Sequence, residues 1–134
     1  MHLEVLTERG RALFSQLNQV KGFYLAGGTA LALQIGHRQS FDFDLFSSEE
    51  ISASLLPRVK KVLGSLAATT TVNNADELTL LADGVKITFL FYPFPVLSEF
   101  VLYEGVSLLS VARRARNLLL EYSSSCHSAT FGAR

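Results

Sequence analysis

The stretch Phe23–Ser47, FYLAGGTALALQIGHRQSFDFDLFS, constrains the fold of this chain more than any other. It opens with a short apolar run of β-forming residues, which Gly27-Gly28 then interrupts. We expect a short helix after the glycines, capped by Thr29 and ended by Gly36 in a conformation with positive φ. The pattern therefore predicts a compact unit of strand, glycine turn, helix, loop and second strand.

The second strand is predicted over residues 40–46, because polar and apolar side chains alternate there. Residues two apart on a strand project from the same face, so Asp42 and Asp44 are expected to share one face. The other face is expected to carry the apolar residues of this segment, namely Phe41, Phe43 and Leu45. Two carboxylates arranged in this way can bind Mg²⁺, which prefers oxygen ligands and commonly shares them with substrate phosphates.

Backbone N–H groups at the glycine turn give the same unit a second chemical feature. The start of a helix binds phosphate readily, so Gly27, Gly28 and Thr29 could hold the phosphates of a nucleotide. Each feature alone has an ordinary explanation: acids on a solvated strand face, and a simple turn between a strand and a helix. Found together on either side of one short helix, they favour a site for a metal ion and a triphosphate.

These residues resemble the nucleotidyltransferase core of the AbiEii/AbiGii toxin-type family, a branch of the polymerase-β-like superfamily. The matching pattern is L-x-G-G-T-A-L at 25–31, followed by H-R-x-S-x-D-x-D-L-F at 37–46. The resemblance extends over residues 10–112. It implies Mg²⁺-dependent transfer of a nucleoside monophosphate from an NTP to an RNA (tRNA) or protein hydroxyl. It also implies a cytoplasmic toxin–antitoxin or phage-defence setting with a cognate antitoxin.

The resemblance also assigns roles to individual residues. Arg38 would neutralise phosphate charge and Ser40 would donate a hydrogen bond, although an arginine in solvent explains Arg38 equally well. Two Mg²⁺ ions are implied if the protein is active. The expected site consists of the metal-binding and catalytic pair Asp42 and Asp44, and the substrate-binding residues Gly27, Gly28, Thr29, Arg38 and Ser40.

One element of the family pattern is missing from this sequence. Polymerase-β-like sites generally add a third carboxylate on a neighbouring strand, which corresponds here to a position near Thr88. No Asp or Glu occurs between Val85 and Tyr92, and the spacing gives no support for Asp83 or Glu77 as a substitute. An alternative function is therefore a catalytically degenerate or truncated core that binds a nucleotide or a protein without turnover.

The remaining pattern predicts an α+β fold, a nucleotidyltransferase-like core with helices packed against a mixed sheet. Ser47 and Glu50 form a capping signature for the third helix, and Pro57 is expected to delay its start or kink it. Asp83-Gly84 is a strong hairpin signal. The expected helices are 2–20, 30–35, 48–67 and 107–122. The expected strands are 23–26, 40–46, 69–72, 77–82 and 85–92.

Composition narrows the class of protein further. The length of 134 residues suits one domain, which we expect over 1–122, with a disordered or weakly packed tail over 123–134. The sequence after about residue 112 no longer matches the family, so a truncated or diverged end is expected.

Twelve basic and twelve acidic residues cancel, so bulk charge does not indicate nucleic-acid binding. The single Cys126 and the lack of a membrane-spanning run fit a cytoplasmic protein.

Overall fold

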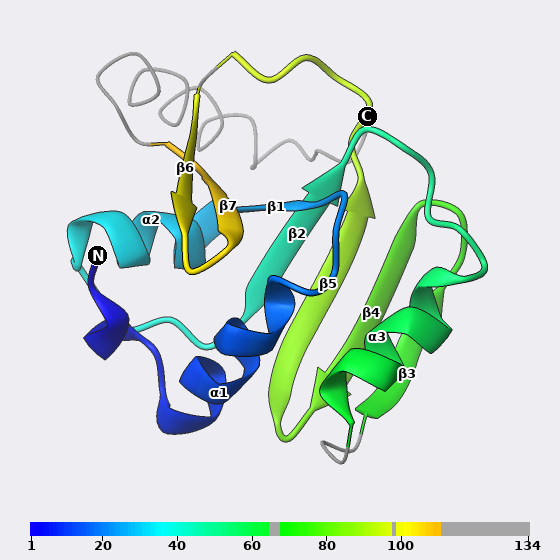
Figure 1. The fold of residues 1–134 in the computed structure, drawn as a ribbon, viewed down its shortest axis with the longest axis horizontal. Helices are drawn as coiled ribbons and strands as arrows, with labels where there is room; N and C mark the ends of the chain where they lie inside the picture. The colour runs from blue at the N-terminus through cyan, green and yellow to red at the C-terminus, as the bar shows by residue number, and fades with distance from the viewer. Residues whose placement is uncertain (65–67, 98, 111–134) are drawn as a thin grey trace.

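The described residues form a seven-stranded mixed sheet with helices packed against it, as predicted for an α+β fold (Figure 1). The computed structural model describes residues 1–64, 68–97 and 99–110. The helices are η1 (Leu3–Val5), α1 (Glu8–Leu17), α2 (Gly27–Ile35) and α3 (Leu55–Leu63). The strands are β1 (Tyr24–Ala26), β2 (Phe43–Ser47), β3 (Ala68–Asn73), β4 (Glu77–Ala82), β5 (Val85–Phe91), β6 (Phe100–Tyr103) and β7 (Val106–Leu109).

Strand β2 lies at the centre of the sheet, whose order is β3-β4-β5-β2-β1-β7-β6. It pairs antiparallel with β1 on one side and parallel with β5 on the other. Alternate residues of the strands form the core, and α1 and α3 lie on that side of the sheet in Figure 1. The strand residues of this core that are no more than 1% exposed are Leu25, Phe43, Leu45, Leu78, Leu80, Ala82, Ile87, Phe89 and Leu108. We call this side the helix face, and the opposite side, which carries Asp44, the site face.

The N-terminal helix predicted over residues 2–20 is wrong as a single element. The chain instead forms the short helix η1 and then α1, which begins only after Thr7. The Thr7 hydroxyl accepts a hydrogen bond from the Gly10 backbone N–H at 3.0 Å and so caps α1. The cap at Thr7 therefore starts a new helix there, although the periodic pattern in the sequence runs through both segments.

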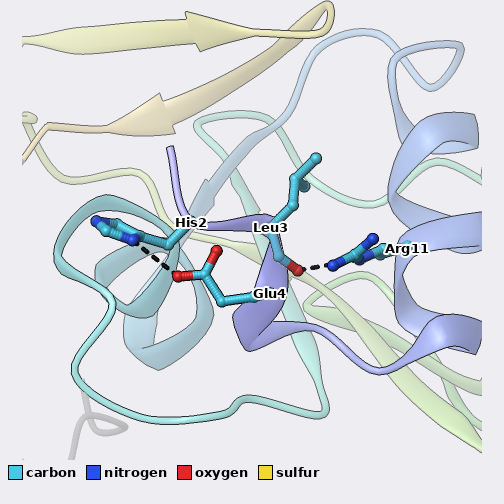
Figure 2. A network of polar contacts seen from close by, with 4 residues as sticks. All are labelled: His2, Leu3, Glu4 and Arg11. Atoms are coloured by element: carbon cyan, nitrogen blue, oxygen red, sulfur yellow. Dashed lines mark hydrogen bonds and ion pairs between the residues drawn. The ribbon is translucent and has the colours of Figure 1, made fainter.

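The N-terminal segment is tied to both α1 and α2. Figure 2 shows Arg11 of α1 donating from Nε to the Leu3 carbonyl at 3.2 Å, and His2 Nδ1 lying 3.0 Å from a Glu4 carboxylate oxygen. The backbone N–H of His2 also donates to the Leu33 carbonyl of α2 at 2.7 Å. The contact between His2 and Leu33 fixes α2 against the N-terminal segment.

Helix α3 starts later than its capping signature predicted. Ser47 ends β2, and its hydroxyl accepts from the Glu49 N–H at 3.1 Å without capping a helix. The helix begins at Leu55 and holds Pro57 in its first turn, where a missing N–H removes no helical hydrogen bond. The delayed start anticipated from Pro57 is thus confirmed, whereas the predicted span 48–67 is wrong at its beginning.

The last predicted helix, 107–122, is wrong over its described part. Residues 106–109 form β7, which pairs with β6 across a turn at Glu104-Gly105, where φ is 51° and 80°. The same geometry occurs at Asp83-Gly84, the predicted hairpin, with φ of 53° and 80°. The rest of that predicted helix and the predicted tail over 123–134 lie outside the described residues. Within the part that is described, no helix has the length and apolar character needed to cross a membrane.

Candidate active site

Asp44 lies in the middle of the sheet, on the site face of β2. Its Cα partners are Ala26 on β1 and Thr88 on β5. Burial of the carboxyl group and the nearby Asp42 raise the pKa of Asp44, while Lys86 acts in the opposite direction. Among the described residues, none gives the Asp44 carboxylate a hydrogen bond or an ion pair. Binding of a proton or a cation would therefore stabilise this half-buried carboxylate.

The predicted strand 40–46 is wrong at its beginning, because β2 begins only at Phe43. Asp42 therefore lies in the loop before β2. The expected alternation holds for Phe43 and Leu45, which are buried, but not for Phe41, which is 58% exposed. The Asp42 side chain is exposed, and its carbonyl accepts a hydrogen bond from the Thr29 hydroxyl. Asp42 therefore reaches the site from a loop that Thr29 holds.

Thr29 and Ser40 form a buried hydroxyl pair and fasten the loop between α2 and β2. The two side-chain oxygens are hydrogen-bonded to each other, and the Ser40 N–H donates to the Val5 carbonyl at 2.9 Å. The prediction that Thr29 caps the helix is wrong: α2 starts at Gly27, and its cap residue Ala26 offers no side-chain hydrogen bond. Any phosphate contact of Thr29 would consequently use its backbone N–H.

The two glycines leave the start of α2 open to the site. Gly27 has φ of +75°, and a Cβ there would lie 3.2 Å from Asp44 Oδ2. A Cβ on Gly28 would lie 2.3 Å from an Arg38 guanidinium nitrogen. Side chains at these positions would fill the space between the helix N-terminus, the Asp44 carboxylate and the Arg38 guanidinium.

Arg38 is exposed, yet its guanidinium lies directly over Gly28. One guanidinium nitrogen donates to the Gln39 carbonyl at 3.0 Å, which holds the side chain against the loop. A cation at a helix N-terminus is unfavourable by itself, because the N-terminus already carries partial positive charge. A bound phosphate would remove this repulsion, so the position of Arg38 favours phosphate binding over a side chain that only faces solvent.

The position expected for a third carboxylate is occupied by Thr88, the Cα partner of Asp44. Its other Cα partner is Thr79 on β4, and both threonines are 5% exposed. The Thr79 oxygen lies 3.4 Å from that of Thr88 and 2.5 Å from a Glu77 carboxylate oxygen. Asp83 lies outside this row, at the β4–β5 turn, where an oxygen of its carboxylate is 3.7 Å from Arg9 Nε. Sequence spacing does not identify the row, because it runs across three strands.

The site supplies oxygen atoms of the kind that magnesium prefers. Asp44 and Asp42 supply carboxylates, and Thr88 adds a neutral oxygen beside Asp44. Within the described residues, no group of three or more His, Cys, Asp or Glu side chains could hold a metal. Magnesium suits such a limited set, because it usually retains water and takes further ligands from substrate phosphates.

An aromatic cluster borders the site on the side away from Asp42. Phe46, two residues beyond Asp44, lies 5.8 Å from both the Tyr24 and the Tyr92 rings, centroid to centroid. Phe100 lies 5.0 Å from Tyr24. Burial and the nearby Tyr92 raise the pKa of Tyr24 to about 12, so this hydroxyl stays neutral. The rings come from different strands and loops, which is why the sequence alone did not reveal the cluster.

Comparison with known proteins identifies one matching family model. The model described as "Nucleotidyl transferase AbiEii toxin, Type IV TA system" matches residues 11–106, well over half of the chain. An uncharacterized protein of Aquifex aeolicus is 37% identical over 77 residues, which are 58% of this chain and 37% of that protein. This chain therefore spans well under half the length of that relative.

Solved structures share the fold. A Helicobacter pylori protein assigned as a nucleotidyltransferase has a TM-score of 0.53 and 23% identity, over 81% of this chain and 54% of that chain. A Thermotoga maritima protein with the same assignment has a TM-score of 0.53 and 16% identity, over 90% of this chain and 89% of that chain. At these identities the likeness establishes the nucleotidyltransferase fold alone.

Proposed function

Because the chain belongs to the AbiEii nucleotidyltransferase toxin family, we propose that it transfers a nucleoside monophosphate from an NTP to a hydroxyl group. The acceptor would be an RNA, such as a tRNA, or a protein. The biological setting would be a cytoplasmic toxin–antitoxin system with a cognate antitoxin. The observation that carries the proposal is the open start of α2, which faces both the unpartnered Asp44 carboxylate and the Arg38 guanidinium.

Each part of the site has a task in this proposal. Asp42 and Asp44, with the Thr88 oxygen, would hold Mg²⁺, which supplies positive charge to neutralise and orient the triphosphate. Backbone N–H groups at the start of α2 would bind phosphate oxygens, and Arg38 would add a charged donor. The Thr29–Ser40 pair keeps Asp42 in place by holding its loop.

Thermal unfolding with and without each Mg-NTP tests the proposal without knowledge of the acceptor. A ligand at 100 times its Kd should add about 2.7 kcal/mol to the free energy of unfolding. We expect a Mg²⁺-dependent rise in Tm that Asp44→Asn abolishes. Asp83→Asn is the matched control, because Asp83 is at the hairpin turn and pairs with Arg9. If the protein unfolds cooperatively but none of the NTPs changes its Tm, the proposed nucleotide site is refuted.

A nucleotide-binding module without turnover is the second candidate, favoured by Thr88 at the position where a third carboxylate is expected. Incubation with radiolabelled NTPs, total RNA and purified proteins separates the two functions. Label in RNA or protein that depends on Asp44 supports the enzyme. A thermal shift with an NTP, together with no label in any RNA or protein, supports the binding module.

A further inference from the structure

We propose that Lys86 makes the acid pair selective for a divalent cation that arrives with a nucleotide, over the same cation free in solution. The inference rests on the proposed function, because it concerns the ligand preference of the same site. It starts from the register of β5, in which Thr88 is the Cα partner of Asp44. Residues two apart on a strand project from the same face, so Lys86 lies on the site face with Thr88.

Burial along β5 agrees with this orientation of Lys86. Val85 and Ile87, on either side of it, are buried in the core of the helix face, whereas Lys86 is exposed. Ile87 is paired with Phe43, so Lys86 lies level with the residue before Phe43, which is Asp42. Lys86 therefore extends from the strand beside β2, on the same side of the sheet as the acid pair.

The Lys86 ammonium group is close enough to act on Asp44 electrostatically. Burial and Asp42 raise the pKa of Asp44, and the positive charge of Lys86 opposes them. Yet none of the described residues forms a hydrogen bond or an ion pair with this ammonium group. The lysine therefore supplies positive charge to the site, with no described residue engaging its three N–H donors.

A second cation lies on the opposite side of the acids. Arg38 lies over Gly28 at the start of α2, the helix that follows β1 on the other side of β2. At the position where a third carboxylate is expected, Thr88 adds no negative charge. Two acids flanked by two cations carry little net charge, so a free divalent cation gains little by binding to them.

A metal–nucleotide complex meets different electrostatics at the same site. A triphosphate carries more negative charge than one divalent cation neutralises, so the complex is still an anion. Its metal ion can bind the acid pair, while its phosphates are attracted by Lys86 on one side and by Arg38 on the other. Lys86 thus opposes binding of the free cation and favours the complex, so its removal should change the two affinities in opposite directions.

Metal titrations on a charge series at residue 86 test this inference without turnover. Electron paramagnetic resonance follows free Mn²⁺ during titration with Mn²⁺ alone, and isothermal titration measures binding of the Mn²⁺ complexes of ATP, GTP, CTP and UTP. Because exposed charges interact weakly and the ion is divalent, we expect Lys86→Met to bind Mn²⁺ alone roughly two- to ten-fold more tightly. Its affinity for Mn-NTP should fall by a similar factor. Lys86→Glu should enlarge both changes, Lys86→Arg should resemble the wild type, and both differences should shrink at high salt.

Lys60→Met is the matched control, because Lys60 is exposed on α3, the helix on the opposite side of the sheet (Figure 1). It should leave both affinities unchanged. If the wild type binds Mn-NTP, but Lys86→Met lowers both affinities or changes neither, the inference is overturned and the proposed function stands. The same holds if no variant, Lys86→Glu included, binds Mn²⁺ alone. A wild type that binds neither Mn²⁺ nor any Mn-NTP would refute the metal–nucleotide site itself, and the inference with it.

Discussion

Asp44 on β2 and Thr88 on β5 are Cα partners in the parallel strand pair at the centre of the sheet. This pairing puts an acid with a raised pKa next to a buried hydroxyl, and no donor among the described residues satisfies the acid. A site of this kind costs stability when it is empty, because burial disfavours a charge that has no partner.

The first prediction concerns stability and pH. A carboxyl group with a raised native pKa binds its proton more tightly in the native state than in the unfolded state. The resulting stabilisation is complete below the unfolded pKa and is lost as the pH rises through the native pKa. Asn at this position keeps its neutral side chain at every pH. Without metal, Asp44→Asn should therefore be more stable than the wild type at pH 7.5, by on the order of 1 kcal/mol.

Urea unfolding in EDTA at a series of pH values from 4 to 8 checks the sign. The stability difference between Asp44→Asn and the wild type should widen as the pH rises. Addition of Mg²⁺ should narrow it, since only the wild type can bind the ion through this carboxylate. A difference that stays constant with pH would show that the Asp44 carboxyl group does not titrate differently in the two states.

The second prediction separates folding from ligand binding at Gly28. An added Cβ would lie 2.3 Å from the guanidinium, which ends a flexible and exposed side chain that can move aside. Because alanine favours a helix over glycine by about 1 kcal/mol, Gly28→Ala should fold with unchanged or higher Tm. It should still lower affinity for Mg-NTP, since Arg38 would be displaced. Unfolding curves and NTP titrations on the same protein measure both effects.

Gly27→Ala provides the contrast to Gly28→Ala. Gly27 has φ of +75° and its added Cβ would approach Asp44 Oδ2 to 3.2 Å, so this variant should lose stability by about 1–2 kcal/mol. Equal losses of stability at the two glycines would contradict the assignment of different roles to them.

The third prediction concerns Arg38. Its side chain is exposed, so Arg38→Ala should leave Tm nearly unchanged. A hydrogen bond to a charged group contributes about 1.5–3 kcal/mol, so affinity for Mg-NTP should fall by roughly 10–100-fold. Arg38→Lys should restore only part of this affinity, because an ammonium group cannot form two parallel bonds to a phosphate. Isothermal titration with each NTP measures the three affinities, and unchanged binding by Arg38→Ala would remove Arg38 from the site.

The fourth prediction concerns the buried pair Thr29 and Ser40. Thr29→Val leaves the Ser40 hydroxyl and the Asp42 carbonyl without their common partner, at a cost of about 1–3 kcal/mol of stability. Ser40→Ala should be destabilising as well, and the double variant should lose less than the sum of the two, because they share one hydrogen bond. Chemical denaturation of the four proteins completes the cycle. Strict additivity would mean that the two hydroxyls do not interact.

Much of the site can be predicted from the stretch 23–47, because its geometry is local. The glycine pair, the positive φ of 66° at Gly36 and the burial of Phe43 and Leu45 all follow from residues within one strand–helix–strand unit. The predictions from local sequence were wrong where a hydrogen bond to a residue outside the helix determined the structure. Thr29 was predicted to cap its helix, but its hydroxyl binds the loop at Ser40 and Asp42 instead.

Some predicted helices and strands also had wrong bounds, because contacts with distant parts of the chain determine where these elements begin and end. Residues 107–110 were predicted to begin a helix, yet Leu108 is paired with Leu25 of β1 and is fully buried. A short apolar segment takes the structure that its neighbours in space allow, and those neighbours lie far away in the sequence.

The sequence by itself determined the α+β class, the glycine turn and the pair of acids, because each depends on spacing within a few residues. Only the tertiary structure decided which residues surround Asp44. Strand pairing brings Thr88 beside it and Thr79 beside Thr88, with Glu77 bonded to Thr79, although these residues lie more than thirty positions further along the chain. Pairing between distant strands is selected by burial of the whole sheet, and no local pattern records which residues it will bring together.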